Sequence, residues 1–167
     1  MLDVSFELKG LDELERKLNE LKETAINKNY AEEERLKTIR FAMRKAANVI
    51  RNKAIEKAKA FDDPNTDTAV WKNIRVAFDG RHFRRTGEFR FKIGVAGGAT
   101  SKEDNDSNKG GDTYYWRFLE FGTQHMSAKP FLRPAMQESM DQAIETFYEE
   151  YKKSIDRAIR KTSRGGQ

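Results

Sequence analysis

Few side chains in this sequence are of the types that carry out catalysis or bind metal ions. The two histidines, His82 and His125, lie far apart on expected loops, and the chain contains no cysteine. A protein zinc site needs three or four nitrogen, sulfur or carboxylate ligands at suitable spacing, and neither histidine has such neighbours. No nucleophile with an adjacent general base is visible either. The sequence therefore predicts a protein with no active site, metal site or cofactor.

Glu120 is a carboxylate set between two large apolar residues, Leu119 and Phe121. A carboxyl group in such surroundings can serve in acid–base chemistry, but structural ion pairs produce the same pattern. We expect the structural role, in which Glu120 forms a salt bridge or a hydrogen bond to the turn at Gly122-Thr123.

A glycine-rich segment at 94–98 does not fit a nucleotide-binding loop. It lacks the Gly-Lys-Ser/Thr ending of a P-loop, and no helical pattern follows it. We expect the end of a strand there, leading into a polar and mobile loop at 97–112.

Basic residues give the chain a net charge of +5 and an isoelectric point near 9.3. The middle of the chain combines arginines with Phe83, a mixture found in nucleic-acid-binding grooves. The candidate DNA- or partner-facing residues are Arg81, Arg84, Arg85 and Arg90. A solvent-exposed hairpin tip and a contact to an acidic neighbouring protein are the alternatives. Acidic residues gather between 12 and 34, so one subunit could present a basic and an acidic side to its neighbours in a ring.

Length and composition fit one domain that is poor in core-forming residues. Of the 167 residues, 37% are hydrophobic and 35% are charged. Such a chain is expected to complete its burial against partner subunits. No stretch approaches the roughly 20 apolar residues of a membrane-spanning helix. Asp3 and Glu7 argue against a signal peptide, so we expect neither export nor membrane contact.

Hydrophobic periodicity predicts the secondary structure. Alternating apolar residues indicate strands at 4–8, 74–78 and 88–95. The last two should pair as a hairpin with a basic connection, in which Asp79-Gly80 indicates a turn. Apolar residues at three- and four-residue spacing indicate helices at 11–21, 31–60 and 134–161.

Together these elements predict an α+β fold in which a small antiparallel sheet packs against two long helices, with a long mobile loop. We expect a single domain over 1–161 and a disordered tail at 162–167. A short helix carrying Val70 and Trp71 should be capped by Thr66 or Asp67.

An aromatic segment between the mobile loop and the last helix is the most distinctive part of the chain. We expect its large apolar residues in the core: Phe118, Leu119, Phe121, Phe131 and Leu132. The Gly-Thr turn and two prolines would set how this segment enters the last helix.

The same segment carries a pattern formed by Tyr115, Phe118, Leu119, Glu120, Phe121, Gly122, Thr123, Pro130, Phe131, Leu132 and Pro134. This pattern resembles the signature of the HK97 gp10-like family, small neck or tail-completion proteins of long-tailed bacteriophages. Residues 6–14 resemble the usual start of the family, and residues 31–60 and 71–95 match its layout more loosely. The arginine-rich connection 79–88 and the polar loop 97–112 depart from the family pattern, so no family role is carried onto them.

The resemblance implies a virion structural protein at the head–tail junction, without catalysis. Such a protein would form a ring, hexameric or matched to the symmetry of portal and tail. It would join the head connector to the tail terminator or tail tube, and DNA passing through the lumen would be a further contact. Its location would be the virion, and the host cytoplasm during assembly.

Two other functions stay open from the sequence. One is a tail terminator, which caps the tail tube and is also a small α+β ring subunit. The other is a basic DNA-binding protein that uses the hairpin and the end of the last helix. Its affinity for duplex DNA would fall steeply with salt. An enzyme has the least support.

Overall fold

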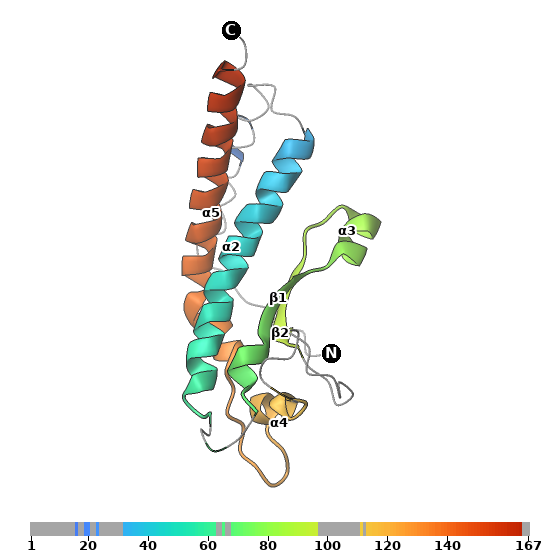
Figure 1. Ribbon diagram of the computed structural model, residues 1–167, viewed down its shortest axis with the longest axis vertical. Helices are drawn as coiled ribbons and strands as arrows, with labels where there is room; N and C mark the ends of the chain where they lie inside the picture. Colours follow the sequence, from blue (N-terminus) through green and yellow to red (C-terminus); the bar gives the residue numbers. More distant parts are fainter. Residues whose placement is uncertain are drawn as a thin grey trace. The chain divides into compact units, whose positions relative to one another are not determined.

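Two long helices and a two-stranded antiparallel sheet make up most of the structure, so the predicted α+β fold is confirmed (Figure 1). The computed structural model describes residues 16, 19–20, 23, 32–62, 65, 68–96, 111 and 113–164. Its elements are α2 (Glu32–Lys59), η1 (Val70–Asn73), β1 (Ile74–Phe78), α3 (Gly80–Thr86), β2 (Phe91–Val95), α4 (Trp116–Phe121) and α5 (Leu132–Arg164).

Several predicted segments fall partly or wholly on residues outside this description. The strand at 4–8 is outside it, and so is the loop at 97–112 apart from Gly111. Of the helix expected at 11–21, only residues 16, 19 and 20 are described, and these three are helical. No described helix is long and apolar enough to cross a membrane.

The chain divides into two compact units. One unit is Ala42–Phe147, and the other combines Met1–Phe41 with Tyr148–Gln167. In the second unit, Tyr151 and Ile155 of α5 are buried. The first unit contains the sheet, the short helices and the hydrophobic core described below. The expectation of a single domain over 1–161 stays a prediction.

The helix α2 begins and ends within one residue of the predicted range 31–60. Neither glycine nor proline interrupts its sequence, and alanine, the best helix former, recurs along it. Ala47, Ala54 and Ala58 are buried at seven- and four-residue spacing. Because these side chains are small, the backbone of α2 can approach its neighbours closely.

The helix α5 extends beyond the predicted range 134–161 at both ends. It continues to Arg164, through the first three residues of the segment predicted as a disordered tail. Pro134 lies in the first turn, where proline is tolerated. Ala143, Tyr151 and Ile155 are buried, as the apolar spacing predicts, whereas Met136 is exposed and Ala135 and Ser139 are buried near the start of the helix.

The sheet confirms the predicted hairpin but not its turn. β1 and β2 are antiparallel, and Ile74 pairs with Val95 at one end while Phe78 pairs with Phe91 at the other. The turn expected at Asp79-Gly80 is wrong, because the connection between the strands contains the helix α3 and Asp79 is its N-cap. Figure 1 shows α3 at the end of the hairpin opposite to α4.

The short helix η1 confirms the helix expected around Val70 and Trp71, although its predicted cap is wrong. Ala69 stands at the N-cap without a side-chain hydrogen bond, and Thr66 and Asp67 lie outside the described residues. At the other end, Asn73 is fully buried. Its Nδ2 donates to the Gly111 carbonyl and to Thr113 Oγ1, both at 3.0 Å, and so ties η1 to the chain just before α4.

The core of the unit Ala42–Phe147 gathers residues from α2, η1, β1 and the start of α5: Ala54, Ala58, Val70, Ile74, Phe131 and Ala135. Phe131 has no exposed surface, which confirms its predicted place in the core. Its ring lies 5.8 Å from that of Phe61 between centroids. Leu119 and Leu132 are half-buried and pack against this core.

Replacing Phe131 by alanine should therefore destabilise the fold strongly. Loss of the buried ring and the resulting cavity should lower the free energy of unfolding by about 3–5 kcal/mol, measured by urea denaturation. Phe118→Ala is the matched control, because Phe118 is 49% exposed and its loss opens no cavity. Equal stability of Phe131→Ala and the wild type would contradict the assignment of Phe131 to the core.

Candidate functional site

The carboxylate of Glu120 is the centre of the distinctive segment, and only 1% of this residue is exposed. Its Oε2 accepts hydrogen bonds from the backbone N–H groups of Phe131 (2.8 Å) and Leu132 (3.0 Å). Its Oε1 accepts from the N–H of Arg133 at 3.1 Å. The first N–H groups of a helix have no partner within the helix and carry a partial positive charge. Glu120 therefore caps α5 from the end of α4.

Proline completes this cap. Pro134 has no N–H group, and the N–H of Ala135 already donates to the Phe131 carbonyl at 3.3 Å. Glu120 thus accepts hydrogen bonds from the three N–H groups at the start of α5 that have no other acceptor. This arrangement explains why α5 begins at Leu132, two residues before the predicted start.

Arg133 balances the buried negative charge. Its Nε donates to Glu120 Oε1 at 3.1 Å, and a terminal nitrogen donates to the Glu120 carbonyl at 2.7 Å. A buried carboxylate is tolerated when it is paired and fully hydrogen-bonded. The structural role and the salt bridge of Glu120 are as predicted. The hydrogen bonds go to the start of α5, however, rather than to the turn at Gly122-Thr123.

That turn brings the chain back toward α4. Gly122 has φ +76°, and a Cβ atom there would lie 2.9 Å from the backbone nitrogen of Ala128. Only glycine fits such a position without strain. Thr123 N–H donates to Met126 O at 2.9 Å, and Lys129 N–H donates to Leu119 O at 2.7 Å. These hydrogen bonds hold the loop 122–130 against α4, and Phe131, which follows the loop, lies in the core.

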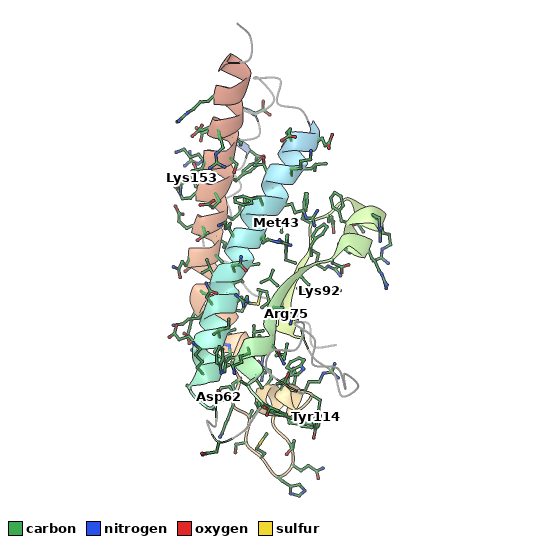
Figure 2. The ribbon with its side chains drawn as sticks, viewed as in Figure 1. Met43, Asp62, Arg75, Lys92, Tyr114 and Lys153 are labelled. Carbon is green, nitrogen blue, oxygen red and sulfur yellow. The ribbon has the colours of Figure 1, made fainter. Side chains whose placement is uncertain are left out.

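The consequence is an exposed aromatic face made of Tyr114, Phe118 and Phe121. These residues are 57%, 49% and 55% exposed, respectively. The prediction that Phe118 and Phe121 belong to the core is wrong. Phe118 and Phe121 are three residues apart and so lie on the same side of α4, whereas Leu119 and Glu120 lie on the opposite side. Tyr114, labelled in Figure 2, lies just before α4.

A second exposed feature is the α3 arm, which we define as residues 79–90. Asp79 organises it: its Oδ1 accepts from the His82 N–H at 3.1 Å, and its Oδ2 lies 2.7 Å from Lys92 Nζ. The hydrogen bond from Lys92, followed by that from the His82 N–H, lowers the pKa of Asp79 to about 2. The sequence gives little sign of this, because Asp-Gly favours a turn as much as a helix cap.

The inside of the arm is aromatic. Phe83 packs on Phe89 with 4.7 Å between ring centroids, and Phe78 lies 5.4 Å from Phe91 and 5.9 Å from Phe83. The arm therefore has a small core of its own.

The outside of the arm is basic, and its contact with DNA or a partner stays a prediction. Arg81, Arg84 and Arg85 are exposed on α3. The fourth predicted residue, Arg90, is 51% exposed and lies 3.9 Å from Asp79 Oδ2, so part of its charge is neutralised.

The two histidines do not form a site with each other. His82 lies in the arm, 9% exposed, with Nε2 3.1 Å from a carboxylate oxygen of Glu88. His125 is exposed in the loop after α4. Among the described residues, no group of three or more histidine, cysteine or acidic side chains could hold a metal ion.

Comparison with protein families decides the class of protein. A family model named HK97-gp10-like, described as the tail component of bacteriophage HK97, gp10, matches residues 12–122, about two thirds of the chain. The chain belongs to this family. Comparisons with curated proteins and with solved structures found no match.

Membership makes the protein a structural component of the phage tail rather than an enzyme, and one that works with other virion proteins in the virion. The matched range includes Glu120 and the exposed aromatic face. It ends at Gly122, so the second half of the signature, including Pro130 and Phe131, lies beyond the matched residues.

Glu120→Gln should weaken the junction of α4 and α5. The amide keeps the shape but loses the charge, and its NH2 group faces donors instead of accepting from them. We expect the free energy of unfolding to fall by about 2–3 kcal/mol in urea denaturation. Glu138→Gln is the matched control, because Glu138 also pairs with a cation but is 49% exposed. Equal effects of the two substitutions would show that burial of Glu120 has no special importance.

The stability of the α3 arm should decrease at low pH. The pKa of Asp79 in the fold, about 2, is below that of an unfolded aspartate, about 4. The stabilisation by Asp79 is therefore complete above pH 4 and is lost as the pH falls through 2. NMR titration of the Asp79 carboxyl group, together with hydrogen exchange of the α3 amides, measures this. In Asp79→Asn the acid-dependent change should vanish, and an ordinary titration near pH 4 in the wild type would refute the network.

Proposed function

We propose that this tail component is a neck or tail-completion protein that forms a ring at the head–tail junction and joins the head connector to the tail. The observation that carries the proposal is the aromatic face, which a buried carboxylate holds exposed and in a fixed position. The family assignment supplies the virion setting.

The aromatic face has the properties of a protein-binding surface. Aromatic residues and arginine contribute most of the affinity at protein interfaces. Phe121 lies 5.1 Å from the guanidinium carbon of Arg133, so both kinds of residue meet there. Because Glu120 and the core residue Phe131 already fix α4, little conformational entropy remains to be lost on binding.

A ring needs two different surfaces on each subunit, because each interface joins one side of a subunit to another side of its neighbour. The aromatic face and the α3 arm are two such surfaces within Ala42–Phe147. Leu119 of α4 packs on the core beside Ile74 and Val95, at one end of the hairpin. The arm begins after Phe78, at the other end.

The test is electron microscopy of lysates from the parent phage after deletion of this gene. We expect DNA-filled heads beside separate tails of normal length, because heads and tails assemble but do not join. Complementation with Phe118→Ala plus Phe121→Ala should leave them separate, whereas Met136→Ala, which also removes an exposed apolar side chain, should restore whole particles.

Other phenotypes would overturn the joining role. Tails of uncontrolled length would make the protein a tail terminator. Intact infectious particles from the deletion would remove it from the junction. Melting temperatures of the purified variants separate a lost interface from a lost fold, and the aromatic double variant should melt close to the wild type.

A further inference from the structure

Arginine side chains flank the exposed phenylalanines of the aromatic face. Arg117 precedes Phe118 directly and Phe121 by four residues, and residues four apart lie on the same side of a helix. Arg117 is exposed, with its guanidinium carbon 5.6 Å from the centre of the Trp116 ring. The guanidinium carbon of Arg133 lies 5.1 Å from the centre of the Phe121 ring, and the Arg133 side chain is 47% exposed. Cations therefore stand next to the exposed rings.

The charge around α4 is positive. Residues 113–135 contain three lysine or arginine side chains, Arg117, Lys129 and Arg133, and one acidic side chain, Glu120. Glu120 is buried and paired with Arg133, so these two charges offset each other. Arg117 and Lys129 are exposed and form no ion pair with any residue that the structure describes. The exposed surface of α4 and of the loop after it therefore carries two positive charges that nothing in the described chain neutralises.

The backbone and the packing around α4 keep this charge on its outer side. The N–H of Lys129 donates to the Leu119 carbonyl at 2.7 Å, so the Lys129 side chain begins next to the helix. Asp62, which follows α2, lines a hollow with Leu119 on the inner side of α4 and accepts a hydrogen bond from Trp71 Nε1 at 2.7 Å. Asp62 therefore lies away from the exposed rings and does not neutralise Arg117.

We infer that the aromatic face binds an acidic region of another virion protein, in which carboxylates stand beside apolar side chains. The rings cover the apolar residues of this partner, and Arg117 and Lys129 lie opposite its carboxylates. Complementary charge of this kind raises the association rate and excludes wrong partners more than it adds affinity. The inference rests on the proposed function, because it takes the aromatic face to be a contact surface in the virion. It directs this face to the head or the tail rather than to the basic α3 arm of a second copy.

An acidic protein fits this surface better than a nucleic acid does. Affinity for a nucleic acid grows with the number of phosphates that cations neutralise, and the described residues around α4 offer two such cations. The guanidinium group of Arg133 is already engaged, because it donates to the carboxylate and the carbonyl of Glu120. Aromatic rings beside arginine are, by contrast, typical of the centre of a protein interface.

The test is selection of random short peptides displayed on yeast, with the full-length protein as the bait. Peptides that the wild type enriches and that Phe118→Ala plus Phe121→Ala does not enrich are those that use the aromatic face. We expect these peptides to carry aspartate or glutamate beside apolar residues well above the frequency in the library. Failure to enrich any peptide, or enrichment of apolar residues without acidic ones, would overturn the inference.

Reversal of the two unpaired charges tests the residues themselves. Arg117→Glu plus Lys129→Glu leaves the cap of α5 unchanged. We expect this variant to bind the enriched peptides roughly 10-fold more weakly at low salt and to select peptides with lysine or arginine instead. The matched control is Arg157→Glu plus Arg160→Glu, which makes the same change in net charge on exposed residues of α5 and should bind as the wild type does. Circular dichroism melts should show that both variants fold, and equal weakening in both would mean that only net charge matters.

Two further measurements would identify a different occupant. A single-stranded oligonucleotide that competes with the enriched peptides and binds the wild type more tightly would show that the face accepts nucleic acid. Self-association of the wild type in sedimentation velocity, lost in Phe118→Ala plus Phe121→Ala, would show that the face holds a second copy. Either result overturns the inference.

Failure of this inference is distinguishable from failure of the head–tail role. Peptide selection uses purified protein alone, whereas the deletion phenotype does not depend on the charge of the partner. Neutral enriched peptides together with separate heads and tails would refute only the acidic partner. Acidic enriched peptides together with intact particles would refute only the joining role.

Discussion

The arrangement of the distinctive segment depends on one buried carboxylate. Removing Glu120 from water is costly, and this cost is offset by three backbone N–H groups and by Arg133. Because those N–H groups begin α5, the end of α4 and the start of α5 are fixed to each other. Phe131, at the same point, enters the core. Leu119 and Glu120 occupy the inner side of α4. Phe118 and Phe121 therefore lie on its outer, exposed side.

Features that depend on neighbouring residues could be predicted from the sequence, whereas features that join distant residues could not. The long helices and the hairpin follow from periodicity, and the burial of Phe131 was correctly expected. The sequence predicts a core position for Phe118 and Phe121 because both side chains are large and apolar. It does not show that Glu120 occupies the side of α4 that faces the core.

The two exposed features suit a structural protein in different ways. The aromatic face is apolar and fixed, as a stable protein contact requires. The α3 arm carries positive charge, and charged surfaces attract partners over longer distances, though salt weakens the attraction. The protein therefore presents surfaces of different chemistry on one unit. Among the described residues the core is small, and Phe131 is its largest fully buried side chain.

Among the residues that the structure describes, aromatic side chains of the hairpin and its connection pack together inside the α3 arm. Phe78, Phe83, Phe89 and Phe91 pack on one another, and Asp79 and Gly87 define the ends of the helix. Such a segment can be exchanged as a cassette. Related phages could replace the outward residues of α3, or the whole segment, to suit different neighbours while the remaining chain keeps its packing.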